Sequence, residues 1–169
     1  MLKLLRALLG RSKKSQRDNE DLPQESQWIR WKPNVQPPAA PSGFVNLTGA
    51  TDVAVAGTSY RLDECKVAIS ALKGGRVNAD TVSLIRETDN PEDENAVRVV
   101  VNLRHRTCHI GYLPRDIADR IAHEFAKEMP LEAALREWGQ KKSGDAVFFK
   151  LSLFVPSAKN RRKFIRKAE

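Results

Sequence analysis

The stretch from Leu84 to Arg115 constrains the fold more than any other part of this 169-residue chain. It opens with a short apolar run that ends at the turn Asp89-Asn90-Pro91-Glu92-Asp93. Asn favours the first position of a type I turn and Pro fixes φ at the next. Two further apolar runs, 96–101 and 108–112, flank a second turn, and Pro114 then opens a helix. Three such strands can meander, which would bring the first turn close to the start of the helix.

The polar side chains of the first turn have two interpretations. Asp93 and Asn95 can exchange hydrogen bonds with nearby backbone and so hold a long loop in one shape, which would make them structural. A carboxylate beside an amide can also accept a proton from a sugar hydroxyl, and charge-assisted bonds of this kind are among the stronger ones. The residue types leave both interpretations open, although turn chemistry is the commoner outcome.

The order of these residues resembles the HIRAN domain, from about residue 53 to 127 and more loosely to 155. A dozen or more positions match in fixed order, after a glycine at Gly57: Arg86, Glu87, Asn90, Pro91, Asp93, Asn95, Ala96, Val97, Val99, Ile110, Gly111, Tyr112, Pro114 and Arg115. The resemblance implies a small β-barrel related to the OB-fold. HIRAN domains occur alone or joined to helicase-like ATPases of DNA repair, and the best understood member grips the 3′-hydroxyl end of single-stranded DNA.

The resemblance also implies roles for single residues. Asp93 would accept the 3′-hydroxyl, and Asn90 and Asp89 would line the sugar–base pocket. Arg115 would hold a phosphate, because a guanidinium pairs with phosphate in a bidentate way. Tyr112 would contact the backbone or the sugar from the neighbouring strand end.

One departure from the family pattern affects the expected pocket. The member that binds 3′ ends carries two tyrosines ahead of the glycine, and the matching positions here are near Ala54 and Val55, which cannot stack as a ring does. Tyr60 with Arg61, or Phe149, are the candidate substitutes. An aromatic at one of these positions would give bases a stacking surface.

The net charge of +8 is concentrated at the two ends of the chain. Residues 1–45 carry +4, residues 46–155 carry −1 and residues 156–169 carry +5. We therefore expect a basic N-terminal tail with a Pro-rich linker over 1–45, a near-neutral domain over 46–156 and a basic C-terminal tail over 157–169. Basic tails suit a polyanion such as nucleic acid, although they also serve as solubilising tails.

The N-terminal part has two features of its own. Residues 1–10 are amphipathic but too short to span a bilayer, so a frayed terminal helix is favoured over a helix that binds a surface or partner. Trp28 and Trp31 flank Arg30, and they can stack on bases or dock onto the domain; docking is slightly favoured. Residues 33–41 are Pro-rich and predict a stiff linker.

The remaining patterns predict an α+β, mainly β fold: an OB-like barrel of five to six strands with two or three helices, flanked by disordered basic tails. Apolar periodicity predicts the other elements. These are strands over 52–57, within 76–87 and over 146–155, and helices over 63–72, 115–128 and 130–139.

Sequence signatures of catalysis are absent: the chain has no P-loop, no dinucleotide fingerprint and no HExxH motif. His105, Cys108 and His109 are a poor zinc set, because strand neighbours point to opposite faces. A carboxylate-bound metal at 89–93, serving a nuclease-type hydrolase, is the less favoured alternative. We therefore expect a non-enzymatic module without cofactor or metal.

The expected partners follow from the charge and the resemblance. They are single-stranded DNA or DNA ends, and a helicase-like ATPase or nuclease if the chain instead acts as a protein-interaction adaptor. The two cysteines are far apart and no secretory signal precedes them, which predicts a cytoplasmic protein without a transmembrane segment.

Overall fold

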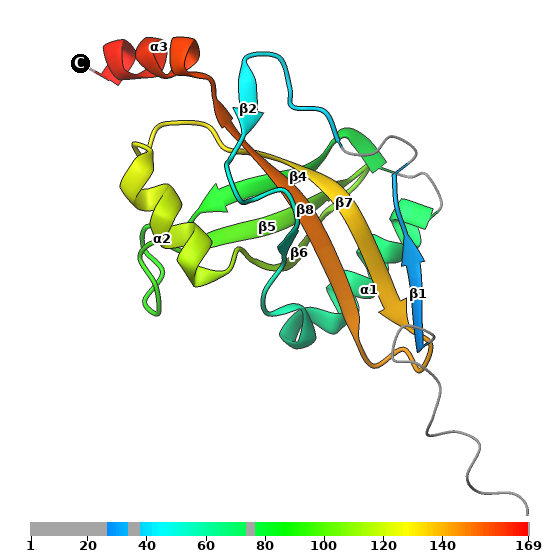
Figure 1. The fold of residues 1–169 in the computed structure, drawn as a ribbon. Helices are drawn as coiled ribbons and strands as arrows, with labels where there is room; N and C mark the ends of the chain where they lie inside the picture. Colours follow the sequence, from blue (N-terminus) through cyan, green and yellow to red (C-terminus); the bar gives the residue numbers. More distant parts are fainter. Residues whose placement is uncertain (1–26, 34–37, 74–76, 169) are drawn as a thin grey trace, which may run out of the picture.

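The computed structural model describes residues 27–33, 38–73 and 77–168. They form two antiparallel sheets with three α-helices and one 3-10 helix (Figure 1). The elements in chain order are β1 Trp28–Trp31, β2 Phe44–Asn46, β3 Val53–Ala54, η2 Thr58–Arg61, α1 Leu62–Lys73, β4 Val77–Arg86, β5 Val97–Leu103, β6 Thr107–Tyr112, α2 Arg115–Glu124, β7 Glu132–Lys141, β8 Val147–Pro156 and α3 Ala158–Ala168.

The small sheet has the order β4-β5-β6, so the predicted meander is confirmed. Alternation along β6 also follows the prediction, with Cys108 and Ile110 fully buried and His109 on the other face. The free edge of β6 is covered by α1, because Glu64 Oε2 accepts the His109 backbone N–H at 2.7 Å and the Cys65 thiol lies 3.5 Å from the Ile110 carbonyl oxygen. Burial raises the pKa of Cys65 to about 12, which fits an inert thiol in the core.

The large sheet has the order β1-β7-β8-β2, with β3 also paired to β8. The helix predicted over 130–139 is wrong, because this segment is the strand β7. A bulge explains the error: the register shifts between Leu135, which pairs with Leu151, and Trp138, which pairs with Phe149. The extra residue lets two side chains three positions apart face the same core, and that spacing imitates one face of a helix.

One short bridge joins the two sheets. Ala56 and Tyr112 exchange both backbone hydrogen bonds, at 2.8 and 3.0 Å. Gly111 permits this approach: its φ is +142°, and a Cβ there would collide with the Ala56 carbonyl and come within 2.8 Å of Val55. The described residues contain eight strands in two sheets rather than five or six in one closed barrel, so the OB-like barrel is not confirmed.

Both ends of the described chain differ from the expected tails. β1 and the first two residues of β2 lie within the predicted tail 1–45 yet belong to the large sheet, and Trp28 and Trp31 are docked there as favoured. The predicted disorder after residue 156 is wrong, since α3 occupies 158–168 and Phe164 packs against the core. The amphipathic segment 1–10 lies outside the described residues, and the division into domain and tails stays a prediction. α2 ends at Glu124, four residues earlier than expected.

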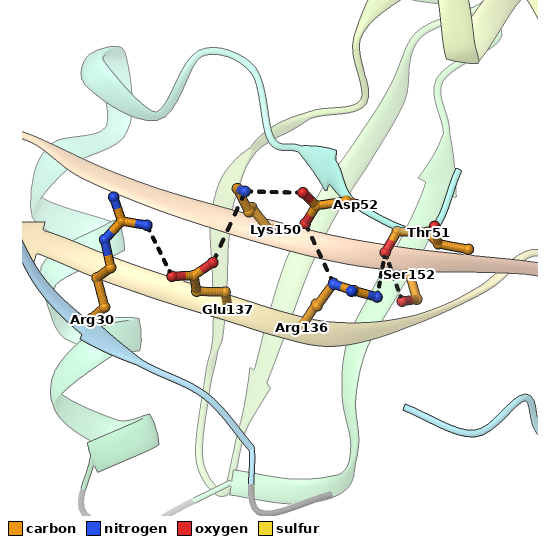
Figure 2. Close-up of polar contacts among 7 residues, drawn as sticks. All are labelled: Arg30, Thr51, Asp52, Arg136, Glu137, Lys150 and Ser152. Atoms are coloured by element: carbon orange, nitrogen blue, oxygen red, sulfur yellow. Dashed lines mark hydrogen bonds and ion pairs between the residues drawn. The ribbon is translucent and has the colours of Figure 1, made fainter. Parts of the chain in front are cut away.

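A chain of ion pairs crosses the outer face of the large sheet (Figure 2). We call it the paired network, and its members alternate in charge: Arg30, Glu137, Lys150, Asp52 and Arg136. Successive nitrogen–oxygen distances are 3.2, 3.9, 3.0 and 3.5 Å. Because these residues come from β1, β7, β8 and the segment before β3, the network ties the N-terminal strand to the rest of the sheet.

Candidate nucleic-acid interface

The first turn is held by its own polar side chains. Asn90 Oδ1 accepts the backbone N–H groups of Glu92 and Asp93 at 2.9 and 3.3 Å, and Asn90 Nδ2 donates to Glu87 at 2.8 Å. Asp93 Oδ1 accepts the Asn95 N–H at 2.9 Å. These bonds support the turn interpretation of Asn90, because both the oxygen and the nitrogen of its side-chain amide form hydrogen bonds in and next to the turn. Asp89 is exposed at the start of the turn.

The turn meets the start of α2, as the meander predicts. Arg115 Nε lies 3.3 Å from Asp93 Oδ2, and Arg115 Nη2 lies 3.4 Å from the Glu92 carbonyl oxygen. The Arg115 side chain is 71% exposed and that of Asp93 is 21% exposed. A carboxylate has lone pairs for more than these two contacts. Asp93 can therefore accept a hydroxyl while Arg115 offers its remaining N–H groups to a phosphate.

A second group of candidate residues gathers where η2 lies beside β6. We call Tyr60, Arg61, His109 and Tyr112 the η2–β6 patch. The Arg61 guanidinium lies over the Tyr112 ring, 5.9 Å from its centroid, and His109 contacts that ring edge-on at 4.9 Å. Tyr60 is 92% exposed, and a shallow hollow of about 440 Å³ runs along residues 59–64. In the chain, Tyr112 at the end of β6 comes three residues before Arg115 at the start of α2.

His109 enters the patch although the sequence pattern marked it only as a possible metal ligand. Its Nε2 lies 3.0 Å from the Gly111 carbonyl oxygen. Burial and then the nearby Arg61 charge lower the pKa of His109 below its usual 6.5, which favours the neutral ring at pH 7. His105 lies exposed in the turn before β6 and Cys108 is buried, so the three residues do not converge. Within the described residues, no three His, Cys, Asp or Glu side chains are placed to hold a metal ion.

Two further residues that the sequence singled out, Glu87 and Phe149, have different surroundings in the structure. Glu87, a matching position of the motif, bonds Asn90 and also lies 2.8 Å from Arg98, so it supports the turn from inside the meander. Phe149 is fully buried in the core and has no face free for a base. Its neighbour Phe148 faces outward instead, but Arg30 lies 5.5 Å above its ring and Trp28 contacts it edge-on at 5.3 Å.

The geometry so far defines a small, mostly β domain with exposed aromatic and cationic side chains near one strand end. The model of the HIRAN domain family matches residues 48–152, which is more than half of the chain. The chain therefore belongs to the HIRAN domain family, known in general for binding nucleic acid. None of the described helices is long and apolar enough to cross a membrane.

Two solved structures are similar to the chain. A protein from Lactobacillus plantarum shares 18% identity, with a TM-score of 0.40, over 66% of this chain and 96% of its own. The HIRAN domain of human HLTF shares 19% identity, with a TM-score of 0.36, over 72% of this chain and 83% of its own. No curated protein sequence matches the chain.

Proposed function

We propose that this chain is a non-catalytic module that binds single-stranded nucleic acid, and that it recognises the 3′ end of DNA during repair or fork processing. Two observations carry the proposal together: the η2–β6 patch and the Asp93–Arg115 pair. They combine an exposed ring, a guanidinium over a second ring, and a mostly exposed arginine. Stacking surfaces and phosphate-binding cations together are what sequence-tolerant single-strand binding requires.

Each residue has a role in this proposal. Tyr60 stacks on a base, taking the place of the tyrosines that the chain lacks at Ala54 and Val55. Arg61 and Arg115 contact phosphates, and Tyr112 contacts sugar between them. Asp93 accepts the terminal 3′-hydroxyl with the oxygen lone pairs that its turn bond and ion pair leave over.

The adaptor alternative loses two of the residues that first suggested it. That alternative relied on Trp28, Trp31 and the amphipathic segment 1–10. Both tryptophans are half-buried in the large sheet, and the segment 1–10 lies outside the described residues. Trp31 also carries the Lys73 ammonium 4.6 Å from its ring centroid. We therefore keep nucleic-acid binding as the single candidate function, with the helicase or nuclease as a partner that the complex would serve.

The test compares 10-nucleotide DNA strands with a free or a phosphorylated 3′ end. We expect the parent protein to prefer the free end and Asp93→Asn to remove that preference, because Asn keeps an oxygen for the Asn95 N–H but loses the charge. Glu94→Gln is the matched control: it removes an exposed carboxylate from the same turn and should leave the preference intact. Arg115→Gln should weaken both strands alike.

Two results would count against the proposal at different levels. Equal binding of free and phosphorylated ends by the parent protein would remove 3′-end recognition but leave single-strand binding. No measurable binding to either strand at low salt would remove nucleic-acid binding through this interface altogether.

A further inference from the structure

The C-terminal helix α3 carries the most one-sided charge in the described structure. Its eleven residues, AKNRRKFIRKA, include six Lys or Arg and no Asp or Glu. Lys159, Arg162 and Lys163 are exposed, and none of the ion pairs found among the described residues involves α3. Lys159, Arg162 and Lys163 therefore have no acidic partner within the part of the fold that the structure describes.

α3 is nevertheless fixed in place by its other face. Asn160 Nδ2 and the Ser157 N–H each donate to the Gly43 carbonyl oxygen at 2.9 Å. The Arg161 guanidinium lies over the Phe125 ring at 4.6 Å, and Phe164 packs against the core. The helix is thus docked to the domain through this face, while Lys159, Arg162 and Lys163 stay exposed.

Like charges at helical spacing oppose the formation of this helix. Lys159 stands three residues before Arg162 and four before Lys163, and pairs of like charge at these spacings are destabilising. A polyanion lying along the helix would remove that repulsion and release counterions. The charge pattern is therefore suited to a ligand rather than to the stability of the isolated domain.

We propose that α3 is a second phosphate-binding surface, which contacts the backbone of a nucleic-acid strand already held at the proposed interface. This inference rests on the proposed function, and it extends the bound length. Arg161 lies over Phe125, the residue after the end of α2, whereas Arg115 begins α2. With a rise of about 1.5 Å per residue, the helix separates the two places by roughly 15 Å. We expect a strand of about four nucleotides, the lower end of single-strand site sizes, to occupy the first interface alone and only a longer one to reach α3.

Nucleic acid fits α3 better than an anionic membrane does. Helices that lie on membranes combine a cationic face with an apolar face that enters the lipid. In α3, Phe164 is the aromatic residue and it already packs against the core of the domain. Among the α3 side chains that the structure describes, no large apolar group is therefore left to enter lipid, whereas phosphate contacts to a strand need no apolar insertion.

The experiment compares two double variants that each remove two exposed cations. Arg162→Gln with Lys163→Gln alters α3. Arg104→Gln with Lys142→Gln alters the turn between β5 and β6 and the turn between β7 and β8. Each protein is titrated with a 4-nucleotide and a 20-nucleotide DNA strand, and with vesicles of phosphatidylserine and phosphatidylcholine. Circular dichroism checks that both variants fold.

For the 20-nucleotide strand, we expect the α3 variant to lose about tenfold in affinity at low salt. The slope of log K against log salt should become shallower by about 1.4. The turn variant should change little, and the 4-nucleotide strand should bind both variants like the parent. Four results would overturn the proposal. The two variants could lose equal affinity for the long strand, or the α3 variant could lose as much affinity for the short strand as for the long one. The loss could be confined to vesicles, or the parent could fail to bind the long strand. Failure of the proposed function is distinguishable, because Tyr60→Ala would then leave the short-strand affinity unchanged while the α3 effect remained.

Discussion

On the outer face of the large sheet, Arg30, Arg136 and Lys150 each lie 3.0–3.5 Å from a carboxylate oxygen. In the η2–β6 patch, Arg61 has no carboxylate partner among the described residues and lies instead over the Tyr112 ring. The rings differ in the same way. Phe148, which contacts Arg30 of the paired network, is covered by Arg30 and Trp28, whereas Tyr60 is 92% exposed.

The contrast teaches that a surface rich in cations and rings is not by itself an interface. Glu137 is 8% exposed at the centre of the paired network, so its charge is satisfied by Arg30 and Lys150 and theirs by it. Such groups contribute to stability and resist a new partner, because a ligand would first have to break their bonds. The η2–β6 patch leaves the Tyr60 ring uncovered, and Arg115, although paired with Asp93 at 3.3 Å, keeps 71% of its side chain exposed, so that donors remain for a ligand.

The largest expected effect concerns the bridge that positions Tyr112. Gly111→Ala should lower the free energy of unfolding by roughly 3 kcal/mol or more, since the new Cβ meets the Ala56 carbonyl at a φ of +142°. Gly57→Ala is the matched control, with positive φ but no atom within 4 Å of the added Cβ, and should cost about 1–2 kcal/mol. Chemical denaturation measures both, and equal costs would show that the close approach at Gly111 is unimportant.

The second effect separates stability from binding in the paired network. Glu137→Gln removes the charge between Arg30 and Lys150 and should cost about 1–3 kcal/mol of stability. Affinity for a single strand should not fall. Glu132→Gln, earlier in β7, serves as the control and should change neither quantity. A loss of strand affinity in Glu137→Gln, with the fold intact, would place the network inside the interface.

The third effect is the reverse case, in which a substitution weakens strand binding without lowering stability. Tyr60→Ala should leave the thermal midpoint unchanged, because the ring is almost fully exposed, and should weaken strand binding about tenfold, as expected for one lost stacking contact. Phe148→Ala should lower the midpoint and leave affinity unchanged. Fluorescence anisotropy with a labelled strand measures the affinities. Unchanged binding in Tyr60→Ala would remove this ring from the interface.

The smallest effect is a pH dependence. The pKa of His109 is lowered in the folded state, so the unfolded state binds its proton more readily. The contribution of His109 to stability is therefore complete above pH 6.5 and is lost as the pH falls through the lower, folded-state pKa. The unfolding free energy of the parent, relative to that of His109→Gln, should therefore decrease as the pH falls below 6.5. A difference independent of pH would contradict the lowered pKa.

Local signals in the sequence predicted much of the fold. The Asn90-Pro91 turn, the alternating strands and the helix after Pro114 gave the small sheet and brought Asp93 to Arg115, because each depends on neighbours in the chain. The bulge in β7 could not be predicted in this way. An inserted residue changes the spacing of Leu135 and Trp138 from two to three, and only the partner strand β8 reveals it.

The site shows the same limit. Tyr112 and Arg115 follow from the meander, but the approach of Arg61 to Tyr112 depends on the Ala56–Tyr112 bridge between segments about fifty residues apart. His109 was weighed only against metals, because its ring contacts come from that same packing. Phe149 looked available because strand alternation alone does not say which face of β8 meets the core.

The most direct test of the account is the salt dependence of single-strand binding in two matched double variants. Arg61→Gln with Arg115→Gln removes two cations proposed to contact phosphate, and Arg30→Gln with Arg136→Gln removes two from the paired network. We predict that the slope of log K against log salt becomes shallower by about 1.4 in the first variant and stays unchanged in the second. Equal slopes in the two variants, or a larger decrease in the network variant, would contradict the division between paired and available charge.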